Sequence, residues 1–402
     1  MILKKLVTFG ALMFASYCGM FLLAGAQKRA QTATILYSFG GSPTDANTPY
    51  SGLTYIGTSA KRGYLYGLAY AGGTRGGGAA YKISTAGQYQ IVYNFGSQPN
   101  DGCCPVDPSG MISSGGKLYG TTFAGGGGAQ AAGTVFKLTP QGSEQTLYTF
   151  TDTGSPGEVS FPTAGVATDQ QGNLYGTSSF GGAFGFGAVY QLTPTGQEKL
   201  LWSFGGQSSD GQYPSSVVLD RHGNVYGTTS SGGDSGNGTV FEITAAGAEK
   251  TLYSFQGPPN DGATPYAPPI FDAKGNLYGT TNGGGKFCSP ACGTIFKLTP
   301  QGSESVLWNF GQPDDGVGPY AGLIFDSNGN LYGTTLEGGS DANCGTVFEL
   351  TPSGTEKVLY AFGNPPDGCL PGSVVFDASG NLYGTTWSGG SYAGGTVFKI
   401  AP

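Results

Sequence analysis

A Leu-Tyr-Gly or Val-Tyr-Gly tripeptide recurs seven times along this chain, and this recurrence constrains the fold more than any other feature. Successive copies lie 51 to 56 residues apart, a period typical of a supersecondary unit that cannot bury its apolar face alone. Such units stack on their neighbours to build one continuous core. The seven tyrosines are Tyr66, Tyr119, Tyr175, Tyr226, Tyr278, Tyr332 and Tyr383.

Each unit carries four short segments rich in Val, Ile, Thr, Tyr and Phe, as β-strands are. In order, they are an apolar run (321–326), Asn-Leu-Tyr-Gly-Thr-Thr (330–335), Gly-Thr-Val-Phe-Lys-Leu (133–138) and Leu-Tyr-Ser-Phe (252–255). Asp-x-x-Gly-Asn joins the first segment to the second, and Thr-Pro-x-Gly joins the third to the fourth; both are tight-turn sequences. Four antiparallel strands per unit are typical of one β-propeller blade.

The two ends of the repeat region indicate how the ring closes. A lone fourth-type strand opens the repeats at 35–39, and the chain finishes on a third-type strand at 395–400. Each strand type then occurs seven times if the N-terminal strand completes the last unit. We therefore predict an all-β, seven-bladed β-propeller with four antiparallel strands per blade, whose last blade is closed by the N-terminal strand. Its core should lie between stacked blades.

Glycine supplies 75 of the 402 residues, a proportion that collagen or a disordered tract also reaches. Collagen needs glycine at every third position, and disordered chains lack regularly placed aromatic residues, so neither class fits. The glycines are therefore expected in turns. With a net charge of -7 and no Lys/Arg cluster after the first thirty residues, nucleic-acid binding is not expected.

Residues 1–26 have the pattern of an export signal. Lys4 and Lys5 precede an apolar run over 6–23, and Ala24-Gly25-Ala26 fits the small-x-small rule for cleavage after Ala26. The alternative is an uncleaved anchor helix, because the apolar run is long for a signal. We expect a short linker at 27–33, a single propeller domain at 34–402, and a monomer that is secreted or held at the cell surface.

Six cysteines follow the predicted signal, and an even number in an exported chain favours disulfides. The spacing of Cys288 and Cys292 also fits half of a zinc site, but one His and no second such pair leave too few ligands. The predicted pairs are Cys344 with Cys369 in loops of adjacent blades, Cys288 with Cys292 within one loop, and Cys103 with its neighbour Cys104.

The runs Asn-Leu-Tyr-Gly-Thr-Thr, Gly-Thr-Val-Phe-Lys-Leu-Thr-Pro and Leu-Tyr-Ser-Phe resemble the GloVer tandem repeat, a choice-of-anchor repeat family of exported bacterial proteins. The resemblance covers about residues 34 to 400. It implies an exported or surface location and often a C-terminal sorting anchor, whereas this chain ends at Pro402, just after its last predicted strand. It implies no defined catalytic residues.

The long loops between second and third strands share one face of the ring with the blade-to-blade loops; we call it the loop face. There, one residue after each Gly-Thr-Thr run differs between blades. Blades six, seven, one and two, which are neighbours after closure, carry Leu336, Trp387, Tyr70 and Phe123. We hypothesise a one-sided aromatic patch that stacks on a sugar or holds a peptide. The alternative is aromatic packing beneath the loops.

Six units carry an aspartate shortly before the proline that begins a blade. One interpretation is a ring of carboxylates that binds a cation such as Ca²⁺. The other, which we favour, is that each aspartate caps its own turn, so that no cofactor is expected. The six are Asp45, Asp101, Asp210, Asp261, Asp315 and Asp367. Asp272, Asp326 and Asp377, in the hairpin sequences, are also interpreted as turn formers.

Enzymatic motifs are scarce. His222 is the one His and sits in a tight turn on the opposite face, which argues against a Ser-His-Asp arrangement. A glycosidase needs only two carboxylates, and Glu158, which replaces the usual aspartate in one inter-blade loop, is the candidate. We expect a non-enzymatic extracellular binding module for a glycan or a surface protein. The alternative is a carbohydrate-active hydrolase or lyase with a carboxylate pair on the loop face.

Overall fold

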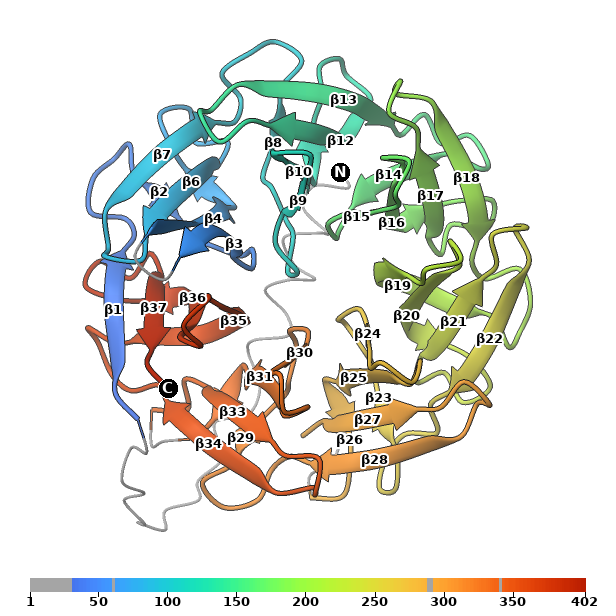
Figure 1. Cartoon of the computed structure of the whole chain (residues 1–402). Coiled ribbons are helices and arrows are strands. Elements are labelled where there is room, and N and C mark those ends of the chain that lie inside the picture. The colour runs from blue at the N-terminus through green and yellow to red at the C-terminus, as the bar shows by residue number, and fades with distance from the viewer. Residues whose placement is uncertain (1–30, 60–61, 288–291, 340–341) are drawn as a thin grey trace.

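The computed structural model describes residues 31–59, 62–287, 292–339 and 342–402, and its regular elements there are all β-strands. Seven antiparallel blades stand around a central axis, which confirms the predicted all-β, seven-bladed propeller (Figure 1). The predicted signal at 1–26 and most of the linker lie outside the described residues. None of the described residues belongs to a helix long and apolar enough to cross a membrane.

The first four blades follow the chain in order, each from its innermost strand outward. Blade 1 comprises β3 (Thr54–Ser59), β4 (Arg62–Ala69), β6 (Ala79–Ser84) and β7 (Tyr89–Asn94). Blade 2 comprises β9 (Ile112–Ser114), β10 (Lys117–Thr122), β12 (Ala131–Leu138) and β13 (Glu144–Thr151). Blade 3 comprises β14 (Val159–Pro162), β15 (Ala167–Thr168), β16 (Leu174–Gly181), β17 (Ala188–Leu192) and β18 (Glu198–Ser203). Blade 4 comprises β19 (Gly211–Leu219), β20 (Val225–Gly232), β21 (Thr239–Ile243) and β22 (Glu249–Ser254).

The remaining blades repeat this order. Blade 5 comprises β24 (Ile270–Phe271), β25 (Leu277–Thr281), β27 (Thr294–Leu298) and β28 (Glu304–Asn309). Blade 6 comprises β30 (Ile324–Phe325), β31 (Leu331–Thr335), β33 (Thr346–Leu350) and β34 (Glu356–Ala361). Blade 7 comprises β35 (Gly368–Phe376), β36 (Leu382–Gly389), β37 (Thr396–Ile400) and β1 (Ala33–Ser38). Two-residue strands pair on the loop face: β2 (Ala46–Asn47) with β5 (Ala71–Gly72), β8 (Gly102–Cys103) with β11 (Ala124–Gly125), β23 (Gly262–Ala263) with β26 (Gly283–Gly284), and β29 (Gly316–Val317) with β32 (Glu337–Gly338).

The N-terminal strand completes blade 7, as predicted. β1 runs antiparallel to β37, with Ala33 opposite Ile400 and Ser38 opposite Thr396. In Figure 1 the blue β1 lies along the outer edge of the red blade. Because the first and last described strands share one sheet, the ring closes without leaving β37 as an unpaired edge.

The glycine of the Tyr-Gly pair makes room for a ring. In each blade an aromatic side chain of the third strand lies over that glycine, so that a Cβ at Gly384 would meet the Phe398 ring at 2.5 Å and one at Gly176 would meet the Tyr190 hydroxyl at 2.3 Å. Contacts below 3.0 Å require the neighbour to shift, and a packed core does not yield easily. The recurring glycine is therefore a packing requirement of every blade.

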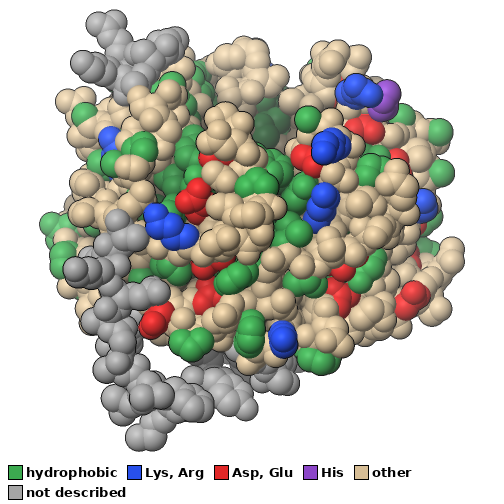
Figure 2. Space-filling view, turned by 60° about the horizontal axis from the view of Figure 1, so that its bottom comes forward, with side chains coloured by type: hydrophobic (Ala, Val, Ile, Leu, Met, Phe, Trp, Pro, Cys, Tyr) green, Lys and Arg blue, Asp and Glu red, His purple; other side chains and the backbone are tan. Residues whose placement is uncertain are grey.

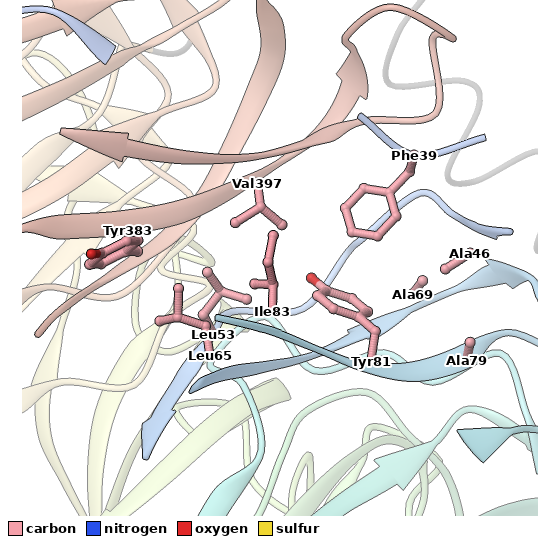
Figure 3. Packing of buried hydrophobic residues seen from close by; sticks show 10 residues of the cluster. All are labelled: Phe39, Ala46, Leu53, Leu65, Ala69, Ala79, Tyr81, Ile83, Tyr383 and Val397. Atoms are coloured by element: carbon pink, nitrogen blue, oxygen red, sulfur yellow. The ribbon is translucent and has the colours of Figure 1, made fainter. Parts of the chain in front are cut away.

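Apolar contacts between neighbouring blades form the core. The buried hydrophobic residues described here fall into seven clusters, one at each blade interface. At the interface of blades 7 and 1, Phe39 and Val397 face Tyr81 and Ile83 (Figure 3). At every interface an edge-to-face ring pair recurs, with centroids 4.9 to 5.1 Å apart, and such pairs add stability beyond the area they bury.

The threonines of the Gly-Thr-Thr run form hydrogen bonds between blades and within a blade. The first threonine donates to a carbonyl of the next blade's innermost segment, as Thr280 does to Ala321 at 3.1 Å and Thr385 does to Ser51 at 3.0 Å. The second threonine bonds a third-strand threonine, as in the 2.8 Å contact between Thr386 and Thr396. These buried hydroxyls are satisfied, so they cost little on burial.

Candidate functional site

Every blade has a proline near its start on the loop face, and the residue before that proline has a left-handed backbone. Its φ lies between 53° and 65° in all seven blades. Only Gly318 is a glycine there, although positive φ is uncommon for other residues. The residues in order are Thr48, Cys104, Phe161, Tyr213, Thr264, Gly318 and Leu370. In five blades an aromatic ring flanks this proline: Phe161 and Tyr213 precede it, and Tyr50, Tyr266 and Tyr320 follow it.

Aromatic residues that follow the proline meet near the axis of the ring. Tyr50 of blade 1 stacks on Trp387 of blade 7 with centroids 4.2 Å apart, and its hydroxyl lies 3.5 Å from that of Tyr320 of blade 6. Tyr320 also stacks on Tyr266 of blade 5 at 4.9 Å. Blades 1 and 6 are not neighbours, so these contacts are possible only close to the axis. We call Tyr50, Tyr266, Tyr320 and Trp387 the inner cluster.

The inner cluster is a packed group of rings. Trp387 is only 8% exposed, and its Nε1–H, also buried, has no hydrogen-bond partner. Burial raises the pKa of all three tyrosines of the cluster, most for Tyr320. Trp387 is the buried member of the inner cluster, and Tyr50, Tyr266 and Tyr320 are each partly exposed.

Aromatic residues that precede the proline, together with rings of the adjoining loops, form a second group. Phe161 lies 5.3 Å from Phe123 and 6.3 Å from Phe180, and Tyr213 lies 6.4 Å from Phe180 and 5.8 Å from Phe186. All five rings are partly exposed and together run across blades 2, 3 and 4. We call Phe123, Phe161, Phe180, Phe186 and Tyr213 the outer arc. Phe184, 54% exposed, is in the same loop as Phe186.

Hydroxyl groups accompany the outer arc. Thr163 and Ser179 lie 2.7 Å apart, and Ser179 donates to the Pro214 carbonyl at 3.3 Å. Ser230 donates to the Tyr213 carbonyl, also at 3.3 Å. Each hydroxyl oxygen keeps acceptor capacity, and the arc itself contains no charged side chain. On the face shown in Figure 2, Lys and Arg side chains are scattered among Asp and Glu and form no single basic patch.

The four residues of the hypothesised aromatic patch occupy different surroundings. Tyr70 is 39% exposed, Leu336 is partly buried, Phe123 belongs to the outer arc, and Trp387 belongs to the inner cluster. In the described part of the chain, no ring contact joins Tyr70, Phe123 and Trp387 to one another. The sequence analysis missed Phe161, Phe180, Phe186 and Tyr213, although the aromatic residue before an entry proline was a visible signal.

The six blade-entry aspartates bond within their own turns. Asp45 accepts from the Gly40 N–H at 2.9 Å and from the Ala46 N–H at 2.8 Å, and Asp367 accepts from the Gly363 N–H at 2.8 Å. The turns of Asp101, Asp210, Asp261 and Asp315 have corresponding bonds. Burial raises the pKa of Asp210 and Asp315. Across the described residues, no three His, Cys, Asp or Glu side chains gather closely enough to hold a metal ion.

The hairpin aspartates and two other candidates also lie in turns. Asp272 accepts from the Asn276 N–H at 2.9 Å, and Asp326 and Asp377 bond their own turns in the same way. Against the raising effect of burial, these hydrogen bonds lower the pKa of each carboxyl. Glu158 accepts from the Thr153 N–H at 2.8 Å, and His222 lies in an exposed turn where Arg221 contacts its Nε2.

A set of glutamates at the start of outer strands went unnoticed in the sequence. Burial, followed by the charge of the blade-entry aspartate of the same unit, raises the pKa of Glu144, Glu249 and Glu304 to about 7 and that of Glu356 to about 8. The same pairing recurs in four blades. It therefore belongs to the repeat and does not single out one catalytic site.

The cysteines differ in state. Cys344 and Cys369 form the predicted disulfide between neighbouring loops. Cys292 is buried and disulfide-bonded, but Cys288 lies outside the described residues, so its identity as the partner stays a prediction. The predicted disulfide between Cys103 and Cys104 is not formed in this structure, where both are thiols with sulfur atoms 3.2 Å apart.

Asp107 is the most unusual carboxyl of the described chain, and the sequence analysis passed over it. Its side chain is fully buried; Oδ1 accepts from the Ser109 N–H at 3.1 Å, and Oδ2 has no hydrogen-bond partner. Burial raises its pKa to about 8, against the lowering effect of nearby backbone N–H groups. Blade 2 has two extra residues between its entry proline and its innermost strand. Ile112 lies seven positions after Pro105, whereas the matching Ile324 of blade 6 lies five positions after Pro319.

The segment from Asp107 to Ser109 reaches the axis of the ring. The Gly52 N–H of blade 1 donates to the Asp107 carbonyl at 3.2 Å. Ser373 of blade 7 donates to the Pro108 carbonyl at 3.0 Å, and the hydroxyl of Ser109 lies 3.2 Å from that of Ser216 of blade 4. One segment of blade 2 thus contacts three other blades. The buried carboxyl of Asp107 belongs to this segment, so its place in the structure is explained by packing between blades.

Solved structures with this arrangement have diverse activities. Streptogramin B lyase is 13% identical with a TM-score of 0.56, covering 93% of this chain and 99% of that one. The extracellular domain of a putative one-component system from B. thetaiotaomicron is 10% identical with a TM-score of 0.57, covering 92% of this chain and 40% of that one. A puromycin hydrolase mutant is 11% identical with a TM-score of 0.50, covering 86% of this chain and 52% of that one. At these identities the likeness shows the fold alone.

No curated protein matches the sequence. A family model, the Gloeobacter/Verrucomicrobia repeat, matches residues 127–324 and 288–402, which together make up more than half of the chain. The match agrees with the resemblance found in the repeat sequences, and the chain belongs to the Gloeobacter/Verrucomicrobia repeat family.

Proposed function

We propose that this protein is an exported, non-enzymatic binding module and that the outer arc of its loop face binds a neutral glycan. The observation that carries the proposal is the continuous row of partly exposed rings, from Phe123 through Phe161, Phe180 and Tyr213 to Phe186. Rows of exposed rings on a soluble protein mark binding surfaces, because such a patch is costly to leave in water.

The composition of the arc favours a sugar. Aromatic rings stack on the apolar faces of pyranose rings, while hydroxyl groups nearby exchange hydrogen bonds with the sugar hydroxyls. Ser179 and Ser230 lie beside the arc, and the arc has no charged group that would select an ionic ligand. Export is supported by the predicted signal at 1–26 and agrees with the Cys344–Cys369 disulfide, a bond typical of oxidising compartments.

A glycan array followed by titration calorimetry tests the proposal. Phe161→Ala and Tyr213→Ala should each weaken binding by about fivefold, since one stacking ring contributes on the order of 1 kcal/mol. Tyr392→Ala is the matched control, because this ring is 61% exposed but lies outside the arc, on blade 7.

Two results would count against this function. If no neutral glycan binds, or if Tyr392→Ala weakens binding as much as Phe161→Ala does, the outer arc is not a glycan site. Release of shortened sugars from the bound polysaccharide would instead favour the carbohydrate-active hydrolase or lyase. The array is therefore scored both for glycan that stays bound and for shortened sugars that are released.

A further inference from the structure

The adjacent thiols of Cys103 and Cys104 point toward each other because of the backbone between them. In an extended strand successive side chains point to opposite faces. Cys103 ends β8, but Cys104 occupies the left-handed position before the entry proline, with φ 59°. This turn brings the two sulfur atoms to 3.2 Å, and both residues are partly exposed.

The distance between the sulfur atoms favours closure over metal binding. Two thiolates on a tetrahedral zinc ion, each at about 2.3 Å, lie roughly 3.8 Å apart, and a linear metal would separate them further. The described residues offer no third thiol, imidazole or carboxylate to complete a metal site there. Two partly exposed sulfur atoms already in contact are instead placed to form a bond with each other.

The two thiols are chemically unequal. The hydrogen bond with Cys103, opposed by burial and aided by a hydrogen bond from Tyr70, lowers the pKa of Cys104 to about 7. The same contact raises the pKa of Cys103. Since the thiolate is the nucleophile in disulfide exchange, Cys104 is suited to attack and Cys103 to act second.

We propose that Cys103 and Cys104 form a thiol–disulfide exchange site on the loop face that closes reversibly to a disulfide between adjacent residues. The oxidant is a disulfide of a small thiol or of another protein. The Cys104 thiolate attacks one sulfur of this disulfide, forming a mixed disulfide and expelling a thiolate. Cys103 then gives up its proton, its sulfur attacks the Cys104 sulfur, and the second thiolate leaves. The protein loses two electrons and the disulfide gains them.

The site adjoins the outer arc without depending on it. The Phe123 N–H donates to the Cys104 carbonyl at 3.1 Å, so the first ring of the arc is held by a residue of the thiol pair. The inference stands on the thiols alone and survives if the arc binds no glycan.

The test uses the full chain, reduced under conditions that leave Cys344–Cys369 closed, and oxidised glutathione as the probe. The tryptic peptide 83–117 carries both thiols and no other cysteine, so its mass reports their state. In the wild type this peptide should lose two hydrogens. Cys103→Ser should stop at a stable glutathione adduct on Cys104. Cys104→Ser should react at least about fivefold more slowly than Cys103→Ser, because the introduced serine hydroxyl and Tyr70 can both still donate to Cys104, whereas no neighbouring group lowers the pKa of Cys103.

The proposal is overturned if the wild-type peptide retains glutathione or keeps two alkylatable thiols after oxidation. It is equally overturned if Cys104→Ser reacts as fast as Cys103→Ser. Reopening of the wild-type disulfide by dithiothreitol, with Cys344–Cys369 still intact in the same digest, is the expected sign of reversibility, and failure to reopen contradicts it.

Discussion

The inner cluster and the outer arc occupy the same face of the ring and come from matching places in the repeat, yet their surroundings are opposite. In blade 1 the sequence at the entry proline is Thr48-Pro-Tyr50, and in blade 3 it is Phe161-Pro-Thr163. The ring after the proline, Tyr50, stacks on Trp387 near the axis, whereas the ring before it, Phe161, packs on Phe123 between blades; both Tyr50 and Phe161 are partly exposed. Moving an aromatic residue across one proline thus changes which rings it contacts.

The two groups also divide the ring between them. The inner cluster draws on blades 5, 6, 7 and 1, and the outer arc draws on blades 2, 3 and 4. A symmetric repeat has therefore acquired two unlike halves through its side chains and, in blade 2, through two extra residues after Pro105, while the backbone φ before the proline is similar in every blade. This separation of scaffold from surface is how one fold supports many functions.

The largest expected effect comes from the centre of the inner cluster. Trp387→Ala should destabilise the protein by roughly 3–5 kcal/mol, because the stacked indole is buried and its removal leaves a cavity. Urea unfolding measures the loss, and glycan affinity at a temperature where the variant is folded should not change. A loss of binding with little loss of stability would reverse the roles assigned to the two groups.

The next effect concerns Asp107, whose segment reaches the axis of the ring. Its pKa rises from an ordinary value near 4 to about 8 in the fold, so the native state holds a proton that the unfolded chain has lost. The contribution of this protonated carboxyl is full below about pH 4 and is lost as pH rises through about 8. Between these values wild-type stability should fall by up to about 1.4 kcal/mol per pH unit from this group.

Asp107→Asn isolates that contribution from the glutamates with raised pKa values, which remain in both proteins. The variant should match the wild type at about pH 4 and increasingly exceed its stability as pH rises to 8, because a neutral amide cannot ionise in the buried site. Unfolding curves across this range measure the difference. Parallel curves for the two proteins would show that Asp107 is not protonated in the native state.

Much of the fold could be predicted because its signals are local and repeated. Turn sequences such as Asp272 to Asn276 define the hairpins, and seven copies of each strand type fix the blade number and the closure by β1. The aromatic surface was harder to predict. The positive φ of Thr48, Phe161 and Tyr213 is imposed by the inter-blade connection, and nothing in the propensities of these residues indicates it.

The burial of Asp107 could not be predicted from the sequence, for a different reason. The two extra residues after Pro105 are visible in the sequence, but their reach to the axis depends on contacts with blades that are distant in the chain. Local patterns report turns and strand faces, whereas the burial of one carboxyl depends on which blades surround it.

A smaller effect is expected from moving one ring across its proline. Phe161→Thr combined with Thr163→Tyr gives blade 3 the entry sequence of blade 1 and removes the ring that links Phe123 to Phe180 in the outer arc. Glycan binding should weaken about fivefold, as for Phe161→Ala. Titration calorimetry measures the glycan affinity of this double variant, with Tyr392→Ala as the control. Unaltered affinity would mean that a ring on either side of the proline serves equally well.

The smallest expected effect tests whether the inner cluster depends on its hydroxyl groups or on its rings. Tyr50→Phe removes the 3.5 Å hydroxyl contact with Tyr320 and keeps the stack on Trp387. The loss should be about 0.5 kcal/mol, at the low end for a hydrogen bond because the contact is long. Tyr50→Leu, which removes the stack as well, should cost several times more in the same urea titration. Equal losses for the two variants would assign the stability to the hydroxyl pair and not to the stacked rings.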